Sequence, residues 1–314
     1  MIAEKTYLKP TTVEQAISFA KESEKTFRYL AGGTDVIVNK FQGNNEAECL
    51  IDISSISELK QIIKNGKHIK IGSLVRLEDL KNNSEIKNNF PALIEAAHSV
   101  ASPMIRKTAT LGGNILCENR CVFYNQSEWW RKAVGYCLKC EGDVCIATGG
   151  AKLCYSKFVS DTAPVLIALD AFIEVVDKNG GYMMRLEDIY TGNGLVPRKL
   201  SKTAIIKNIH LPITHNYFCV FKKLRPREAV DFTSITTAVS ISEHGKIRIV
   251  VGGVDPKPVL VEGNKTDNKE ELIKAAAKKC RVVDNDFYTR TYRKEMISVF
   301  LHQAFDEIQK HKKI

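Results

Sequence analysis

The chain has 314 residues, of which 44% are hydrophobic and 26% charged, so extensive disorder is excluded and two domains of ordinary size are expected. Lys and Arg number 46 and Asp and Glu 36, which gives a formal net charge of +10. No uncharged apolar run reaches the ~18–20 residues of a membrane span, and the charged N-terminus lacks the apolar core of a secretory signal. We therefore expect a cytoplasmic protein, in which thiols stay reduced.

The first half of the chain predicts mixed helix and strand. Thr12 to Gln15 forms a capping box ahead of a helix with apolar Val13, Ala16, Ile17 and Ala20. Short strands are expected at 27–30 and 67–72, and helices at 36–38 and 91–101. A helix and then a strand follow over 165–176, and Asn179-Gly180-Gly181 closes a hairpin.

The second half changes in character near residue 196. Four segments predict the antiparallel strands of one meander: 204–211, 216–224, 234–242 and 246–251. Two helices follow, at 268–279 and about 286–309, the second with Tyr288, Tyr292, Met296 and Phe300 (or Val299) on one face. We expect a domain boundary between about residues 180 and 216.

Charge is distributed unevenly. No Asp or Glu occurs between Ile189 and Arg227, but eight basic residues do, so this stretch supplies +8 of the net +10. Such a stretch is typical either of a solvated strand surface or of a face that attracts an acidic partner.

Two segments share a pair of glycines between an apolar stretch and a small polar side chain. They are Leu30-Ala31-Gly32-Gly33-Thr34-Asp35 and Thr110-Leu111-Gly112-Gly113-Asn114. Paired glycines allow a pyrophosphate to approach the backbone N–H groups closely. Neither segment has the dinucleotide-binding or P-loop pattern. A single Gly-Gly pair is more often a plain turn, so the repetition is what favours a nucleotide.

Six of the nine cysteines fall within 38 residues: Cys117, Cys121, Cys137, Cys140, Cys145 and Cys154. Cys49, Cys219 and Cys280 are isolated and are expected to be buried small hydrophobic residues. The expected compartment disfavours disulfides. Spacing alone leaves open an iron–sulfur cluster, a zinc site that uses Cys137-Leu138-Lys139-Cys140, and a cysteine-rich loop without metal.

The two glycine segments, together with Ser160-Asp161-Thr162-Ala163-Pro164 and Ala168-Leu169-Asp170-Ala171, resemble a known family in order and spacing. The family is the FAD-binding medium subunits of the molybdenum hydroxylases, the xanthine dehydrogenase and carbon monoxide dehydrogenase group. The resemblance covers essentially the whole chain and implies an α+β fold. It implies FAD-binding subdomains at 1–60 and 61–212, of the kind found in vanillyl-alcohol oxidase. A C-terminal flavoprotein domain with an antiparallel sheet and helices would follow at 213–314.

Roughly forty residues separate the second glycine segment from Asp161, whereas in most such subunits the two are almost adjacent. This insertion, at 117–156, resembles the β subunits of 4-hydroxybenzoyl-CoA reductases, in which the inserted loop holds a [4Fe–4S] cluster. The resemblance implies four ligands, Cys121, Cys137, Cys145 and Cys154. Cys117 and Cys140 would then not be ligands.

The same resemblance implies an FAD site. Its members would be Tyr29, Leu30, Ala31, Gly32, Gly33, Thr34, Asp35, Val36, Thr110, Leu111, Gly112, Gly113, Asn114, Asp161, Ile206 and Lys222. Asp161 would bind the polar chain of the flavin, although its spacing fits a helix N-cap equally well. Lys222 and Ile206 would lie near the isoalloxazine ring, and a solvated strand residue is the alternative for Lys222.

These features favour an electron-transfer subunit, because the sequence offers no catalytic triad or paired carboxylates. By resemblance, a ferredoxin-like donor would reduce the [4Fe–4S] cluster, and electrons would pass through FAD to a [2Fe–2S] small subunit and a molybdenum-cofactor large subunit. The complex, a heterotrimer expected to dimerise, would reductively dehydroxylate 4-hydroxybenzoyl-CoA to benzoyl-CoA. An alternative is the FAD subunit of a xanthine dehydrogenase-like enzyme acting on a purine or other N-heterocycle. A remote alternative is a zinc-dependent nucleic-acid-binding protein; we expect neither nucleic acid nor membrane as a partner.

Overall fold

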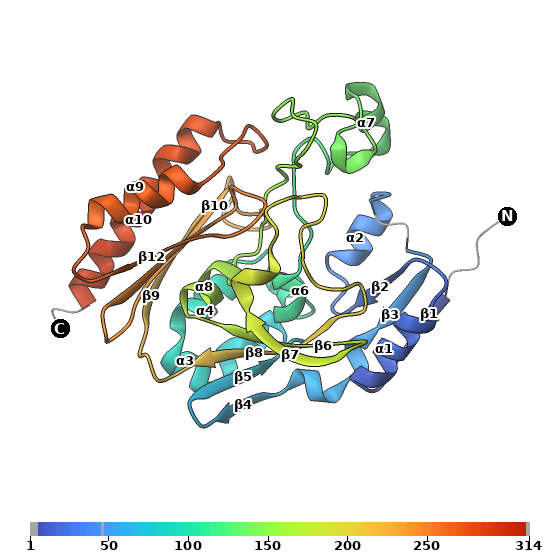
Figure 1. Ribbon diagram of the computed structural model, residues 1–314, viewed down its shortest axis with the longest axis horizontal. Coiled ribbons are helices and arrows are strands. Elements are labelled where there is room, and N and C mark those ends of the chain that lie inside the picture. Colours follow the sequence, from blue (N-terminus) through green and yellow to red (C-terminus); the bar gives the residue numbers. More distant parts are fainter. Residues whose placement is uncertain (1–5, 45–46, 312–314) are drawn as a thin grey trace.

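The computed structural model describes residues 6–44 and 47–311, so the N-terminal five residues that were searched for a signal lie outside it. The described residues form three sheets in chain order, with helices around and between them (Figure 1). No described helix is both long enough and apolar enough to cross a membrane.

The first sheet is parallel, in the order β1-β3-β2, and α1 packs against it. Thr12 caps α1 by accepting a hydrogen bond from the N–H of Gln15, and Val13, Ala16, Ile17 and Ala20 are buried, which confirms the predicted helix. The elements are β1 (Thr6–Leu8), α1 (Val13–Glu22), β2 (Phe27–Leu30), α2 (Val36–Phe41), β3 (Cys49–Asp52) and the 3-10 turns η1 (Ile53–Ser55) and η2 (Ser57–Lys60).

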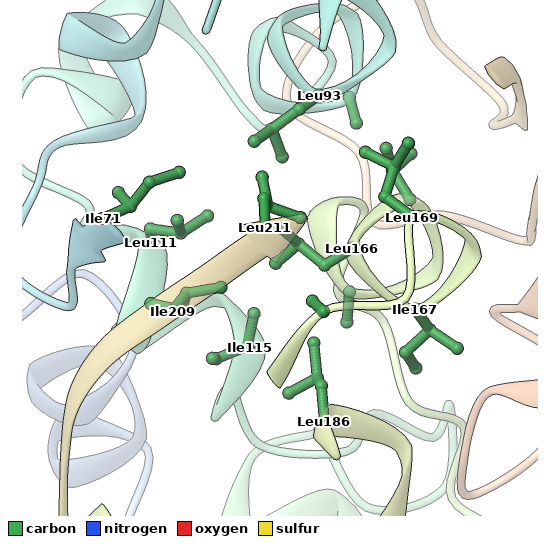
Figure 2. Close-up of a cluster of buried hydrophobic side chains, with 14 of the residues drawn as sticks. Ile71, Leu93, Leu111, Ile115, Leu166, Ile167, Leu169, Leu186, Ile209 and Leu211 are labelled. Carbon is green, nitrogen blue, oxygen red and sulfur yellow. The ribbon is translucent and has the colours of Figure 1, made fainter. Parts of the chain in front are cut away.

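The second sheet is antiparallel, in the order β4-β5-β8-β6-β7. Its core side chains, among them Ile71, Ile209 and Leu211, meet those of Leu93, Leu111 and Leu166 (Figure 2). Its strands are β4 (Ile62–Asn65), β5 (His68–Gly72), β6 (Phe172–Asp177), β7 (Gly180–Arg185) and β8 (Ile205–Pro212). The helices between β5 and β6 are η3 (Leu77–Asn82), α3 (Ser84–Asn89), α4 (Pro91–His98), α5 (Pro103–Arg106), α6 (Leu111–Ile115), α7 (Glu128–Val134), η4 (Leu138–Cys140) and α8 (Thr162–Ala168), and η5 (Leu186–Ile189) follows β7.

The third sheet is an antiparallel meander, β9-β10-β11-β12, and it is buried on both faces. One face packs on the long C-terminal helices, and the other packs on α8 and α4 (Figure 1). All seven residues of β10 are buried as a result. The elements are β9 (Phe218–Leu224), β10 (Ile235–Ile241), β11 (Lys246–Gly252), β12 (Val259–Asn264), α9 (Lys269–Lys279) and α10 (Arg290–His311).

Three sequence predictions need correction. The 204–211 segment does not join the C-terminal meander: as β8 it pairs with β5 and β6, while the fourth meander strand is β12, which the pattern did not predict. The buried face of α10 carries Ile297, Leu301 and Phe305; of the predicted face, Met296 and Phe300 are partly buried against the same core, whereas Tyr292 and the alternative Val299 are exposed. The helix predicted to run to residue 101 ends at His98.

Three clusters of buried side chains follow the order of the chain. One lies mainly within residues 13–59, a second around the five-stranded sheet, and a third between β9–β12 and the two C-terminal helices. We propose on this basis that the divisions near residues 60 and 212 separate three folding units.

Candidate functional site

The structure brings the two glycine segments together. Gly32 lies so close to the backbone of Thr108 and Ala109 that a Cβ on it would collide with the carbonyl of Thr108. Gly33 has φ of +72°, a left-handed conformation that favours glycine, and a Cβ there would meet only the side chains of Leu30 and Ile37, both at 3.4 Å. One glycine of the pair therefore permits the packing, and the other leaves the backbone approachable.

The second glycine segment forms the start of a helix, α6. Thr110 caps α6 by accepting a hydrogen bond from the N–H of Gly113 at 3.1 Å. A Cβ on Gly112 would lie 2.7 Å from the Cβ of Ser73, whereas Gly113 is exposed and would contact only Thr110. As in the first pair, one glycine permits close packing and the other leaves the backbone approachable. Thr110 and Leu111 are buried.

Asn114 connects the second segment to the third motif. Its Oδ1 accepts hydrogen bonds from the hydroxyls of Ser160 at 2.7 Å and Thr162 at 2.6 Å. The helix α8 is capped by Ser160, whose hydroxyl accepts from the N–H of Ala163 at 3.0 Å. Asp161 occupies the N-cap position of α8, as the alternative predicted, but its side chain makes no capping hydrogen bond.

Asp161 instead forms a buried ion pair. Its Oδ2 lies 2.6 Å from Nζ of Lys223, and both side chains are 5% exposed. Burial raises the pKa of the Asp161 carboxyl, and the Lys223 ammonium opposes that shift.

The predicted flavin residue Lys222 points away from this pair. Alternate residues of β9 face opposite sides of the sheet, and Lys222 pairs with Glu307 of α10 on the outer side. Its neighbour Lys223 faces α8 and also donates to the carbonyl of Ser99 at 2.9 Å. The lysine that the structure brings to the predicted flavin residues is therefore Lys223.

The remaining predicted flavin residues range from fully buried in the core to exposed on the first glycine segment. Ile206 is 3% exposed and lies in the central core. The Tyr29 hydroxyl donates to the carbonyl of Thr203 at 3.0 Å, and burial raises its pKa. Leu30, Ala31 and Val36 are half-buried, and Thr34 is exposed.

Asp35 makes contacts that the sequence did not predict. Its Oδ1 pairs with the guanidinium of Arg120, and its Oδ2 accepts a hydrogen bond from the N–H of Glu118 at 2.9 Å. Both of its oxygens therefore bind the first residues of the cysteine-rich insertion.

The four cysteines expected to be ligands line one small pocket. Cys121, Cys137, Cys145 and Cys154 surround it together with Phe123, Tyr124, Leu138, Lys139, Ile146, Ala147 and Ser156. Cys117 and Cys140 do not line it. Cys117 lies instead near Asp35 and Arg198, and burial raises its pKa to about 12.

Three of these cysteines share a local hydrogen-bond pattern. The backbone N–H two residues after each of Cys121, Cys137 and Cys154 points at its sulfur, donated by Phe123, Lys139 and Ser156. The Cys154 thiol in turn donates to the Ser156 hydroxyl oxygen, at 3.3 Å. Burial raises the pKa of Cys121 to about 11, and the Phe123 N–H opposes that shift. Amide donors of this kind stabilise thiolates, the form that binds iron.

Among the described residues, no group of three or more His, Cys, Asp or Glu side chains is placed to hold a single metal ion. A zinc ion requires its sulfur ligands to converge at about 2.3 Å from one point. A cluster of several irons instead spreads its thiolates around its corners, which needs several cysteines that line one pocket and no single point of convergence.

Basic side chains around the insertion were not identified from the sequence. Arg198 stacks on the rings of Phe158 and Tyr190 and donates to the Cys117 carbonyl at 2.7 Å. Lys139 lies 4.7 Å from the ring centre of Tyr124. No periodicity or spacing connects these residues, so only the folded chain shows them.

The acid-free stretch at 189–227 does not present all its charge to solvent. Four of its eight basic residues form ion pairs: Lys207 with Glu58, Lys222 with Glu307, Lys223 with Asp161, and Arg227 with Asp231. Acids elsewhere in the fold thus neutralise part of the predicted basic face.

Comparison with known proteins identifies the family of the chain. Residues 3–214 match the family described as the FAD binding domain in molybdopterin dehydrogenase. The chain belongs to this family. It therefore binds FAD and is the FAD-binding subunit of a molybdenum hydroxylase-family oxidoreductase.

Individual relatives agree with this assignment. The chain is 27% identical to the aldehyde oxidoreductase FAD-binding subunit PaoB of Escherichia coli K12, over 75% of this chain and 77% of PaoB. It is 25% identical to the xanthine dehydrogenase FAD-binding subunit of E. coli O157:H7, over 81% and 75% of the two chains. The carbon monoxide dehydrogenase structure from Hydrogenophaga pseudoflava superposes with a TM-score of 0.76 at 20% identity and covers 98% of both chains, which confirms the predicted fold.

Proposed function

We propose that this FAD subunit also carries a [4Fe–4S] cluster in its inserted loop. The observation that carries the proposal is that four of the six clustered cysteines line one pocket and the other two do not. The amide groups that point at three of the sulfurs support it, because hydrogen bonds to sulfur are among the features that set cluster potentials.

The residues that would hold FAD are those of the two glycine segments, the second of which ends at Asn114, together with Asp161. Gly33 and Gly113 leave backbone free of contact from other segments, as a pyrophosphate requires. When bound, FAD exchanges one or two electrons, whereas a cluster exchanges one, so the pair connects one-electron and two-electron chemistry. The chain's own part is to hold both groups and to exclude water from the buried thiols.

We propose that the subunit transfers electrons within a complex and that the substrate binds another chain. The expected partners are a molybdenum-cofactor large subunit, a [2Fe–2S] small subunit and a ferredoxin-like donor. The relatives are themselves named as FAD-binding subunits or medium chains of an aldehyde oxidoreductase and of dehydrogenases, which supports a multi-subunit assembly.

For the substrate we favour 4-hydroxybenzoyl-CoA, reductively dehydroxylated to benzoyl-CoA, because the cysteine insertion resembles that of these reductases. The second candidate is a xanthine dehydrogenase-like or other N-heterocycle hydroxylase. It is favoured by the relatives that act on such compounds, the xanthine and nicotinate dehydrogenase FAD subunits.

Metal and flavin analysis of the anaerobically purified chain tests the cluster. We expect about four iron and four sulfide per FAD. Zinc in place of iron would contradict the proposal.

The assembled complex tests the substrate. With a low-potential reductant, loss of the phenolic hydroxyl from 4-hydroxybenzoyl-CoA is expected. Turnover of a purine or nicotinate with an electron-accepting dye, and none of the thioester, would favour the hydroxylase.

A further inference from the structure

Arg120 lies directly before Cys121, the first proposed cluster ligand, and only 7% of it is exposed. Its guanidinium pairs with Asp35 and donates to Oδ1 of Asn39 at 3.3 Å. It also lies 4.7 Å from the ring centre of Phe232, in the loop between β9 and β10. One side chain therefore contacts the first glycine segment, the first turn of α2 and the C-terminal unit.

The backbone of Arg120 is fixed as firmly as its side chain. Its N–H and carbonyl exchange hydrogen bonds with those of Lys157, both at 2.8 Å. Lys157 is in turn buried, pairing with Asp286 and donating to the carbonyl of Thr233 at 2.9 Å. The two ends of the insertion, next to Cys121 and Cys154, are thus joined at this point.

The contact with Asp35 is the direct link between the two cofactor regions. Asp35 ends the first glycine segment, and its second oxygen binds the N–H of Glu118. Because the Arg120 charge is buried, it stays where a carboxylate balances it, so the two segments are held in one relative position. A displacement of either segment must break this pair or move the other.

We propose that Arg120 is a positioning residue that couples the two cofactor sites, so that an intact cysteine loop strengthens FAD binding and bound FAD protects the loop. This inference rests on the proposed function, because it requires the cluster in the 117–156 loop. Coupling between two sites is reciprocal, so it can be measured from either side.

The test measures FAD affinity of the full-length chain twice, with its cluster intact and after the iron is removed with a chelator. In the natural chain, we expect cluster removal to weaken FAD binding by about fivefold or more. In Arg120→Gln the two affinities should become nearly equal, whatever their absolute values. Asp35→Asn removes the same contact from the other side and should give the same result. Arg290→Gln, at an exposed arginine, is the matched control and should keep the natural ratio.

The outcomes separate this inference from the proposed function. A natural chain that contains FAD but neither iron nor sulfide would overturn both. A natural chain that contains both groups, with a ratio near one or a ratio that both variants retain, would overturn only the coupling. If Arg120→Gln does not fold, Asp35→Asn alone decides, because it keeps an acceptor for the Glu118 N–H.

Discussion

At Gly32 the first glycine segment, residues 30–35, passes the backbone of Thr108 with no room for a side chain. The contact with Thr108 sets the distance between the two glycine segments, while Gly33 and Gly113 remain open beside it. The identity of a single residue therefore decides whether these two segments can pack together. The same holds in the insertion, where a cysteine either lines the pocket or does not.

Replacing Gly32 with alanine should destabilise the chain by about 1–3 kcal/mol, because a Cβ there overpacks the Thr108 carbonyl. Denaturant unfolding measures this loss. Gly181→Ala is the control, since a Cβ there would meet nothing closer than 3.9 Å. Equal unfolding midpoints for Gly32→Ala and the natural chain would show that the segments are not held by this contact.

Replacing Cys145 with serine should remove the cluster, because Cys145 lines the pocket. FAD should stay bound at saturating flavin concentration. Cys140→Ser is the matched control in the same loop and should keep its iron. Iron and flavin analysis of both variants checks this, and loss of iron from the Cys140 variant would overturn the ligand assignment.

At the scale of elements, the insertion is anchored to the C-terminal unit through Lys157 and Asp286, whose side chains are 8% and 1% exposed. Burial alone would raise the pKa of Asp286, but the Lys157 ammonium and the Arg293 guanidinium outweigh it and lower the pKa. The pair therefore connects the loop after Cys154 to the start of α10 with a charge contact that depends on pH.

Replacing Asp286 with asparagine should cost about 3–5 kcal/mol of unfolding free energy at pH 7, because Lys157 is left buried and unpaired. The folded-state pKa of Asp286 lies below its unfolded value of about 3.9. Its contribution is therefore complete above about pH 4 and is lost as the pH falls through the folded-state pKa. Urea unfolding at several pH values should show the difference between the two proteins shrinking in acid. Asp188→Asn, at an exposed site, is the control, and a difference independent of pH would contradict this account.

Much of the element order could be predicted from the sequence, and the exceptions have physical reasons. On α10 both the predicted aromatic set and the buried set have i, i+4 spacing, so periodicity alone does not distinguish them. The assignment of β8 depends on pairing with β5, more than 130 residues earlier, which no local pattern encodes. Which lysine of β9 faces Asp161 depends on the pairing register of the strand, because neighbouring side chains point to opposite faces. A register shift of one residue would exchange Lys222 and Lys223.

At the scale of the whole molecule, α8 packs between the five-stranded sheet and the C-terminal meander, and Asp161 lies at its start. Two ion pairs join the parts of the molecule. Asp161 with Lys223 joins the start of α8 to the meander, and Asp35 with Arg120 joins the N-terminal unit to the insertion. The fold thus places Asp35, a proposed flavin residue, against the start of the insertion, so under our proposal a cluster in that loop would have a flavin as its neighbour. The family relation establishes FAD, and the insertion is what distinguishes this chain's proposed role.

Reductive titration of the purified full-length chain under anaerobic conditions tests the central claim most directly. A flavin takes up two electrons and a [4Fe–4S] cluster one, so dithionite should deliver about three electrons per chain and produce the spectroscopic signal of a reduced cluster. Uptake of about two electrons, with bleaching of the flavin alone and no iron–sulfur signal, would contradict the claim that both cofactors share this chain.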